Sequence, residues 1–294
     1  MEIFGIPAQA LFGQLLIGLI NGSFYALLSL GLAVIFGLLN IINFTHGAQY
    51  MMGAFVAYLL LERLGIGYWW ALAIAPLLVG ATGVVIERTM LSRLYKLDHL
   101  YGLLLTFGLA LIIQGLFRNQ YGSSGLPYRI PQELTGAQNL GFMFLPNYRA
   151  WVIVASLIVC LSTWYVIERT KLGAYLRAAT ENPQLVQAFG INVPRMITLT
   201  YGFGVGLAAL AGVMAAPIYQ VNPLMGADLI IVVFAVVVIG GMGSIMGAIV
   251  TGFGLGIIEG LTKVFYPEAS NTVIFIIMAI VLLIKPAGLF GTQK

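Results

Sequence analysis

Residues 10–38 read ALFGQLLIGLINGSFYALLSLGLAVIFGL, and no Asp, Glu, Lys or Arg occurs anywhere in residues 3–61. A helix needs about 20 apolar residues to cross the roughly 30 Å of hydrocarbon in a membrane. The charge-free run is therefore long enough for at least two crossings. We expect helices over 10–38 and 46–61, separated by a polar break at residues 40–46.

The rest of the chain has the same character. Its 294 residues are 60% hydrophobic and only 8% charged, whereas a soluble domain averages about 25% charged residues. This composition excludes a soluble enzyme, a nucleic-acid-binding protein and a disordered tail. Further apolar runs predict helices over 68–86, 100–117, 150–167, 196–219, 226–240, 243–262 and 271–285. The prediction is an all-α, polytopic transmembrane bundle of about eight to ten helices with broken or re-entrant segments, in one domain spanning residues 1–294.

The distribution of basic residues predicts the orientation of this bundle. Lys and Arg gather in two loops, at residues 88–96 and 168–195, and such loops are enriched on the cytoplasmic side. Two expected crossings separate them, so both can lie on that side, which puts the N-terminus outside and the C-terminus inside. Residues 118–149, which contain several Gly and Pro, then form an extracytoplasmic loop.

The sequence offers little material for catalysis. No Gly-Lys pair occurs, so the chain lacks a P-loop for ATP. Its two histidines, His46 and His99, cannot make the usual three-ligand zinc site. We expect no enzymatic activity, no metal and no cofactor in this chain.

Charged residues within the predicted spans are also few. Asp228 falls in the first turn of a span, where a helix N-terminus favours negative charge. Glu259 lies four residues before Lys263, the favourable order for an ion pair. Because an ion-coupled transporter usually buries several charged groups, secondary transport is the less favoured alternative.

The segment 168–195 reads ERTKLGAYLRAATENPQLVQAFGINVPR. Three residues mark the ends of a short helix at 183–189: the N-cap Asn182, Pro183 in the first turn, and Gly190 after the last turn. Three apolar residues should share one face of it: Leu185, Val186 and Phe189. That face needs an apolar cover, supplied either by the bundle itself or by a partner protein.

Two breaks in the apolar pattern resemble each other. LNIINFTHGAQYMMGA at 39–54 and VIGGMGSIMGAIVTG at 238–252 each place small and polar residues before a helix that opens with Gly or Ala. Interrupted helices in corresponding halves of a transporter point to its pathway. The pathway candidates are Asn43, Thr45, His46, Gly240, Gly241, Gly243 and Ser244. The alternative is that Asn43 and His46 only satisfy backbone groups at the break.

Several of these stretches together resemble a known family. They are GAYLRAATENPQLVQAFGINVPR at 173–195, NFTHG at 43–47 followed by MMGA, LAALAG at 207–212, and GGMGS-IMGA at 240–248 with Glu259. The chain is similar to the membrane subunits of bacterial branched-chain amino acid ABC importers, of the shorter, LivH-like type. The similarity covers nearly the whole chain. It departs at Ala174-Tyr175, where the family more often has Arg-Ala.

The resemblance implies a multi-pass permease of the bacterial inner membrane. Its partners would be a second homologous permease, two cytoplasmic ATPase subunits that bind and hydrolyse the ATP, and an extracytoplasmic substrate-binding protein. The ATPase-coupling residues would be Arg177, Glu181, Asn182, Gly190 and Ile191, together with Leu185 and Phe189 on the short helix. Branched-chain amino acids are the implied cargo, while urea, short amides or other amino acids remain alternatives.

Overall fold

The computed structural model describes residues 2–3, 6–39, 42–141 and 143–291. All nine ranges expected to be helical contain a helix. These helices are α1 (Ala8–Leu39), α2 (Thr45–Leu64), α3 (Tyr68–Thr89), α4 (His99–Tyr121), α5 (Asn147–Arg169), α8 (Val193–Tyr219), α9 (Met225–Gly240), α10 (Ile245–Phe265) and α11 (Val273–Ile284). Two short helices, α6 (Lys171–Glu181) and α7 (Pro183–Ala188), lie in the basic segment after α5. The all-α helical bundle is confirmed.

Short elements complete the described chain. The 3-10 helices are η1 (Leu91–Arg93), η2 (Gln132–Leu134) and η3 (Pro267–Ala269). Two antiparallel strand pairs occur, β1 (Glu2–Ile3) with β2 (Ile6–Pro7) and β3 (Ala137–Asn139) with β4 (Phe144–Pro146). Residues 42–44 break the helical path between α1 and α2, whereas residues 40 and 41 of the expected break lie outside the described residues.

The helices differ in how far they can reach across a membrane. Six of those described are long and apolar enough to cross it: α1, α3, α4, α5, α8 and α10. The apolar helices α9 and α11 have 16 and 12 residues. At a rise of about 1.5 Å per residue they span about 24 and 18 Å, less than the roughly 30 Å of hydrocarbon. The bundle therefore combines full crossings with shorter segments, as the breaks in the sequence predict.

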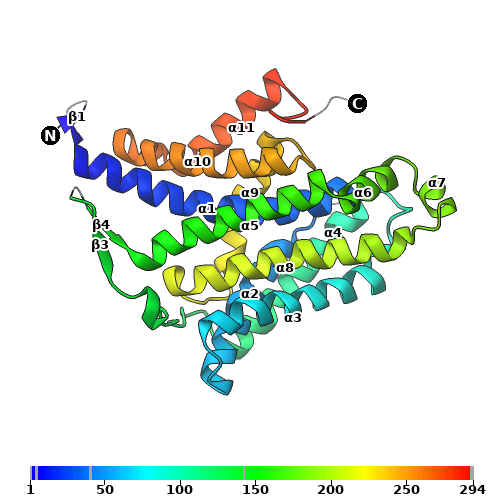
Figure 1. Cartoon of the computed structure of the whole chain (residues 1–294), viewed down its shortest axis with the longest axis horizontal. Coiled ribbons are helices and arrows are strands. Elements are labelled where there is room, and N and C mark those ends of the chain that lie inside the picture. The colour runs from blue at the N-terminus through cyan, green and yellow to red at the C-terminus, as the bar shows by residue number, and fades with distance from the viewer. Residues whose placement is uncertain (1, 4–5, 40–41, 142, 292–294) are drawn as a thin grey trace.

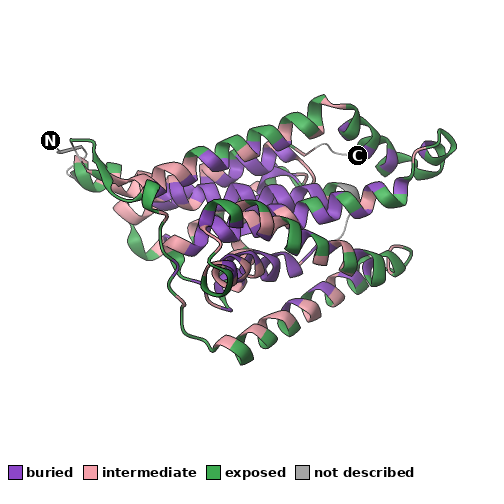
Figure 2. Cartoon of the chain, turned by 60° about the horizontal axis from the view of Figure 1, so that its bottom comes forward, coloured by how far each residue is buried: buried purple, intermediate pink, exposed green. Residues whose placement is uncertain are grey.

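Helices α1 and α8 form the centre of the bundle. In their most apolar stretches 83% and 72% of the residues are buried, against 28% or less in α3, α4 and α5. Figure 2 shows this contrast as purple inner helices flanked by green and pink ones. The outer helices expose many Leu, Ile and Val side chains, which suit contact with lipid tails.

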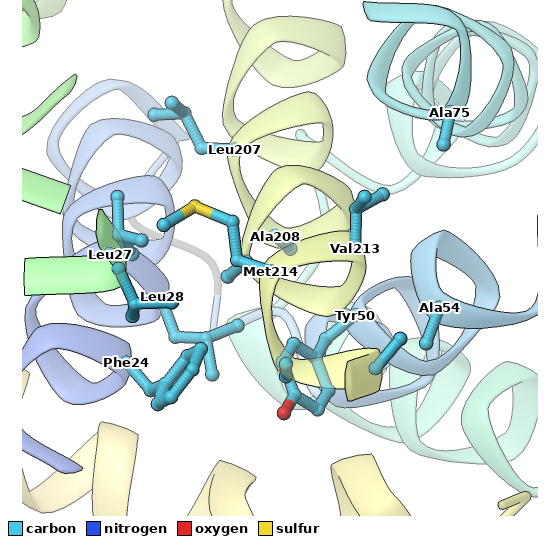
Figure 3. Close-up of a cluster of buried hydrophobic side chains, with 14 of the residues drawn as sticks. Phe24, Leu27, Leu28, Tyr50, Ala54, Ala75, Leu207, Ala208, Val213 and Met214 are labelled. Atoms are coloured by element: carbon cyan, nitrogen blue, oxygen red, sulfur yellow. The ribbon is translucent and has the colours of Figure 1, made fainter. Parts of the chain in front are cut away.

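Small residues allow the central helices to approach closely. A Cβ added to Gly256 of α10 would lie 2.4 Å from the carbonyl oxygen of Gly18 in α1, and one added to Gly53 of α2 would lie 2.2 Å from that of Ala209 in α8. Between these seams lie large side chains, among them Phe24 of α1 and Met214 of α8 (Figure 3). Backbone contact and side-chain packing thus alternate through the core.

The two long loops lie at opposite ends of the bundle. Figure 1 shows α6 and α7 at one end, and the N-terminus with the β3–β4 hairpin at the other. An isolated β-bridge between Leu126 and Val221 joins the loop that follows α4 to the link between α8 and α9. The loop after α4 is thereby attached to the chain just before α9.

Candidate functional site

The segment that follows α5 folds as its cap residues predict. The Asn182 side chain accepts a hydrogen bond from the backbone N–H of Leu185 at 3.0 Å. Gly190 has a φ of +83°, a left-handed conformation that suits glycine because it lacks a Cβ. The helix between them, α7, ends at Ala188, one residue before the expected end.

The apolar face of α7 is divided between the bundle and solvent. Val186 is buried in a cluster of side chains from α6 and α8: Leu176, Ala179, Val193 and Met196. Leu185 is 54% exposed and Phe189 is 77% exposed. The three residues were expected to share one covered face. Only Val186 is covered by the bundle, whereas Leu185 and Phe189 are exposed.

The remaining coupling candidates differ in whether they contact the bundle. Arg177 Nη1 donates to the carbonyl oxygen of Ile167 at 2.9 Å and lies 3.5 Å from Glu168 Oε2. Ile191 packs against the cluster that contains Val186, whereas Glu181 is exposed. Arg177 and Ile191 thus attach the segment to the bundle, and the exposed side chains remain free for a partner.

The first break buries three of the pathway candidates. His46 Nε2 lies 3.0 Å from the carbonyl oxygen of Leu28, and Thr45 Oγ1 donates to that of Thr106 at 2.9 Å. Asn43 Nδ2 donates to Gln49 Oε1 at 3.3 Å. None of these contacts reaches a backbone group at the break, where Thr106 Oγ1 accepts from the N–H of Phe44 at 3.3 Å. The alternative role of Asn43 and His46 is therefore not supported by their contacts. The pathway role remains a prediction.

The second break is a junction of several segments. Gly240 accepts a hydrogen bond from the N–H of Phe290 at 3.0 Å, so the C-terminal segment satisfies a backbone group freed by the break. Ser244 Oγ accepts from the N–H of Gly247 at 3.1 Å and caps α10. Gly243 has a φ of +86°, and a Cβ there would lie 3.0 Å from Gly37 Cα. A Cβ at Gly241 would lie 2.5 Å from the backbone nitrogen of Gly291. The second break is therefore in close backbone contact with both α1 and the C-terminal segment.

One residue from each predicted set lines a shared cavity. A cavity of about 100 Å³ is lined both by Gly243 of the second break and by Arg177 and Thr180 of α6. Residues of α1, among them Ala33 and Gly37, complete its wall. The cavity thus separates α6 from the α9–α10 junction, and α6 itself packs on α5, α7 and α1.

A larger polar cavity lies toward the other end of the bundle and was not predicted. Its volume is about 280 Å³, and its lining comprises Asn21, Phe24, Tyr25, Tyr50, Tyr219, Asn222, Met225, Asp228 and Leu229. For Asp228 the sequence favoured a structural role at a helix N-terminus over a functional one. Asn21 and Tyr25 share a face of α1 at a spacing of four residues inside a run without charged residues, a pattern visible in the sequence.

A hydrogen-bond network supports one wall of this cavity. Tyr25 OH donates to Glu259 Oε2 at 2.7 Å, and Tyr219 OH donates to Asn21 Oδ1 at 2.8 Å. Lys263 forms the expected ion pair with Glu259. Lys263 thus compensates the charge of Glu259, and Tyr25 separates this ion pair from the cavity.

Comparison with known proteins places the chain in a family. Residues 14–282 match the family described as "Branched-chain amino acid transport system / permease component". The permease LivH of Escherichia coli is 30% identical, with 96% of both chains covered. BraD of Pseudomonas aeruginosa shows the same identity and coverage, and a probable LivH of Methanocaldococcus jannaschii is 29% identical over 94% of this chain and 91% of its own. No solved structure matches.

The matched region includes α2 through α10, with both breaks, the α6–α7 segment and the polar cavity between α1 and α9. With its long apolar helices, the protein is a multi-pass protein of the inner membrane. The chain belongs to the permease-component family of branched-chain amino acid transport systems.

Proposed function

We propose that this permease is the membrane-spanning subunit of an ATP-driven importer, and that separate subunits bind and hydrolyse the ATP. The sequence lacks a P-loop, which supports a separate ATPase as the source of energy. The cargo that we propose is a branched-chain amino acid, because relatives covering 96% of this chain carry that name. A second homologous permease and an extracytoplasmic binding protein would complete the assembly.

The observation that carries this proposal is the apolar tip of α7. Leu185 and Phe189 are exposed on a capped helix that projects from one end of the bundle. Large apolar side chains that are exposed together in an aqueous region are typical of protein-binding surfaces. An ATPase groove that receives this tip would bury both side chains.

The contacts of α6 suggest how force from such a subunit would reach the membrane. Arg177 ties α6 to the end of α5, and the cavity that Arg177 shares with Gly243 adjoins the second helix break. Displacement of α7 would therefore shift α6 against the α9–α10 junction. Repeated with each ATP cycle, that shift would alternate the opening of the bundle between its two sides.

The test is Phe189→Asp, with Gln184→Asp as the matched control. One variant places a carboxylate on α7 and the other at its C-cap, but only Phe189→Asp removes an exposed aromatic side chain. We expect Phe189→Asp to abolish co-purification of the ATPase subunits and ATP-driven leucine uptake in proteoliposomes, while the amount of protein inserted in membranes is unchanged. Gln184→Asp should retain both activities. Normal co-purification of Phe189→Asp would contradict the proposal.

A further inference from the structure

The cavity of about 280 Å³ between α1, α2, α8 and α9 has the dimensions of a small ligand site. Its volume is close to the lower end of the roughly 300–1,000 Å³ that is usual for small-molecule pockets. It lies beside the link between α8 and α9, which is bridged to the loop after α4 through Val221 and Leu126. This is the end of the bundle opposite α7 (Figure 1).

The polar part of the lining is rich in hydrogen-bond acceptors. Asp228, in the first turn of α9, is the single acidic side chain among the lining residues, and no lysine or arginine is among them. Lys263 is engaged by Glu259 behind Tyr25. Arg149 of α5 interacts electrostatically with Tyr219, from outside the lining. A carboxylate therefore faces the cavity, and the lining itself holds no lysine or arginine.

Tyr50 contributes a second polar group. The residue is fully buried and lines the cavity, and its hydroxyl has no hydrogen-bond partner within the described protein. A buried hydroxyl without a partner is costly, and most such groups in proteins are paired. A ligand in the cavity would supply the missing partner.

The remaining wall is apolar. Phe24, Met225 and Leu229 line the same cavity as the polar groups. Phe24 and Tyr50 also belong to one cluster of buried side chains (Figure 3). The backbone next to this wall is unusual, since Gln220 has a φ of +60°, the one non-glycine residue with a positive φ in the described chain. Backbone strain of this kind concentrates at ligand sites.

We propose that this cavity is a substrate-contact site that binds the ammonium group and the apolar side chain of a neutral amino acid. Asp228 accepts hydrogen bonds from the ammonium group, the hydroxyl of Tyr50 bonds to the carboxylate, and the wall containing Phe24 and Met225 packs against the side chain. This assignment rests on the proposed transport function and narrows its cargo. Urea and short amides would leave the apolar wall without a partner, and an organic anion would face Asp228 unfavourably.

The test measures thermal stabilisation of the complete transporter complex in lipid nanodiscs by three probes. Leucine carries both charged groups, isopentylamine carries the ammonium group and the apolar tail, and 4-methylpentanoate carries the carboxylate and the tail. We expect leucine and isopentylamine to stabilise the wild-type complex, and 4-methylpentanoate, urea and acetamide to have no effect.

Two variants assign the effect to this cavity. Asp228→Asn should weaken the apparent affinity for leucine and isopentylamine by about tenfold or more, because a hydrogen bond to a charged group is lost. Tyr50→Phe should weaken the apparent affinity for leucine by about tenfold or more, because its hydroxyl bonds to the charged carboxylate, and should leave that for isopentylamine unchanged. Glu268→Gln removes an exposed carboxylate in η3, outside the cavity, and should leave both affinities unchanged.

Equal stabilisation of wild type and Asp228→Asn by isopentylamine would overturn the assignment of Asp228. Stabilisation by acetamide or urea as strong as that by leucine would overturn the ligand class. The binding assay does not require transport, so failure of the proposed function would be recognised separately, as absence of ATP-driven leucine uptake by the wild-type complex.

Discussion

Glu87 is a buried carboxylate at the end of α3 that faces the start of α8. Its side chain accepts hydrogen bonds from Tyr95 OH at 2.6 Å and from Thr198 Oγ1 at 2.7 Å. The residue is only 2% exposed, and buried charges are stable only when they are well hydrogen-bonded. The two donors therefore connect α3, α8 and the loop after η1 at the end of the bundle that carries α7.

Removing one donor should weaken this connection. We expect Tyr95→Phe to lower the free energy of unfolding at neutral pH by about 2 kcal/mol, since a hydrogen bond to a charged group contributes about 1.5–3 kcal/mol. Tyr101→Phe, which alters an exposed tyrosine of α4, should change it by less than about 0.5 kcal/mol. Denaturant unfolding of the purified protein in detergent would measure both. Equal stability of the two variants would show that the Glu87 contact is not stabilising.

The hydrogen bond between Tyr95 and Glu87 should also make the free energy of unfolding depend on pH. Burial and the neighbouring Glu87 raise the pKa of Tyr95 above its ordinary value of 10.0. Below pH 10 the native and unfolded states both hold the proton, so the contribution of Tyr95 to stability is complete. Above pH 10 the unfolded state loses the proton first, which favours unfolding. The stability difference between wild type and Tyr95→Phe should therefore stay constant from pH 7 to about 9 and decrease above about 10. A difference that grows with pH would contradict this assignment.

At the scale of elements, the contact between α1 and α10 depends on glycine. Gly18 and Gly22 on α1 face Gly256 on α10, and a Cβ at Gly256 would lie 2.4 Å from backbone atoms of both. Glycines recur every four residues on both helices. On α1 they are Gly18 and Gly22, and on α10 they are Gly252, Gly256 and Gly260. Such spacing places the small residues on one helical face, where two backbones can meet.

Two substitutions in α10 should have opposite effects. Gly256→Ala should lower the free energy of unfolding by about 1–3 kcal/mol, because its methyl group must push α1 away. A Cβ at Gly254 meets no atom within 4 Å, so Gly254→Ala should stabilise the protein by up to about 1 kcal/mol through helix propensity. Thermal unfolding in detergent would compare them. Destabilisation of equal size at both positions would show that close packing does not distinguish them.

At the scale of the whole molecule, the basic loops define one end of the bundle. The hydrogen bond between Glu87 and Thr198 joins the end of α3 to the start of α8, so the loop after η1 lies at the same end as α7. The β3–β4 hairpin lies at the other end (Figure 1). Because lysine and arginine favour the cytoplasmic side, the hairpin should face outward.

Thiol labelling in intact cells tests this orientation. The native Cys160 is fully buried, so the wild-type protein should not react with a membrane-impermeant maleimide. Gln138→Cys, in β3, should be labelled in intact cells. Leu97→Cys, in the loop after η1, should be labelled only after the membrane is permeabilised. The reverse pattern would mean that the bundle is inserted the other way round.

Much of the helical architecture could be predicted from the sequence, because apolar length and cap residues act locally. The expected helix over 196–219 became α8, and Asn182 and Gly190 bound α7 as their side-chain chemistry requires. The family resemblance was likewise visible in the α6–α7 segment and in the second break. In each case residues close together in the sequence were enough to predict the helix, its ends or the family.

Tertiary structure alone decided which of these residues meet. Leu185 and Val186 are both apolar, yet only Val186 is buried, because α6 and α8 pack against one side of α7. Tyr50 and Asp228 line one cavity although they are far apart in the chain, because α2 and α9 both pack beside α1. Composition and spacing thus fixed the helices and their ends, whereas the cavity and the exposed tip of α7 arose from long-range packing that no local pattern encodes.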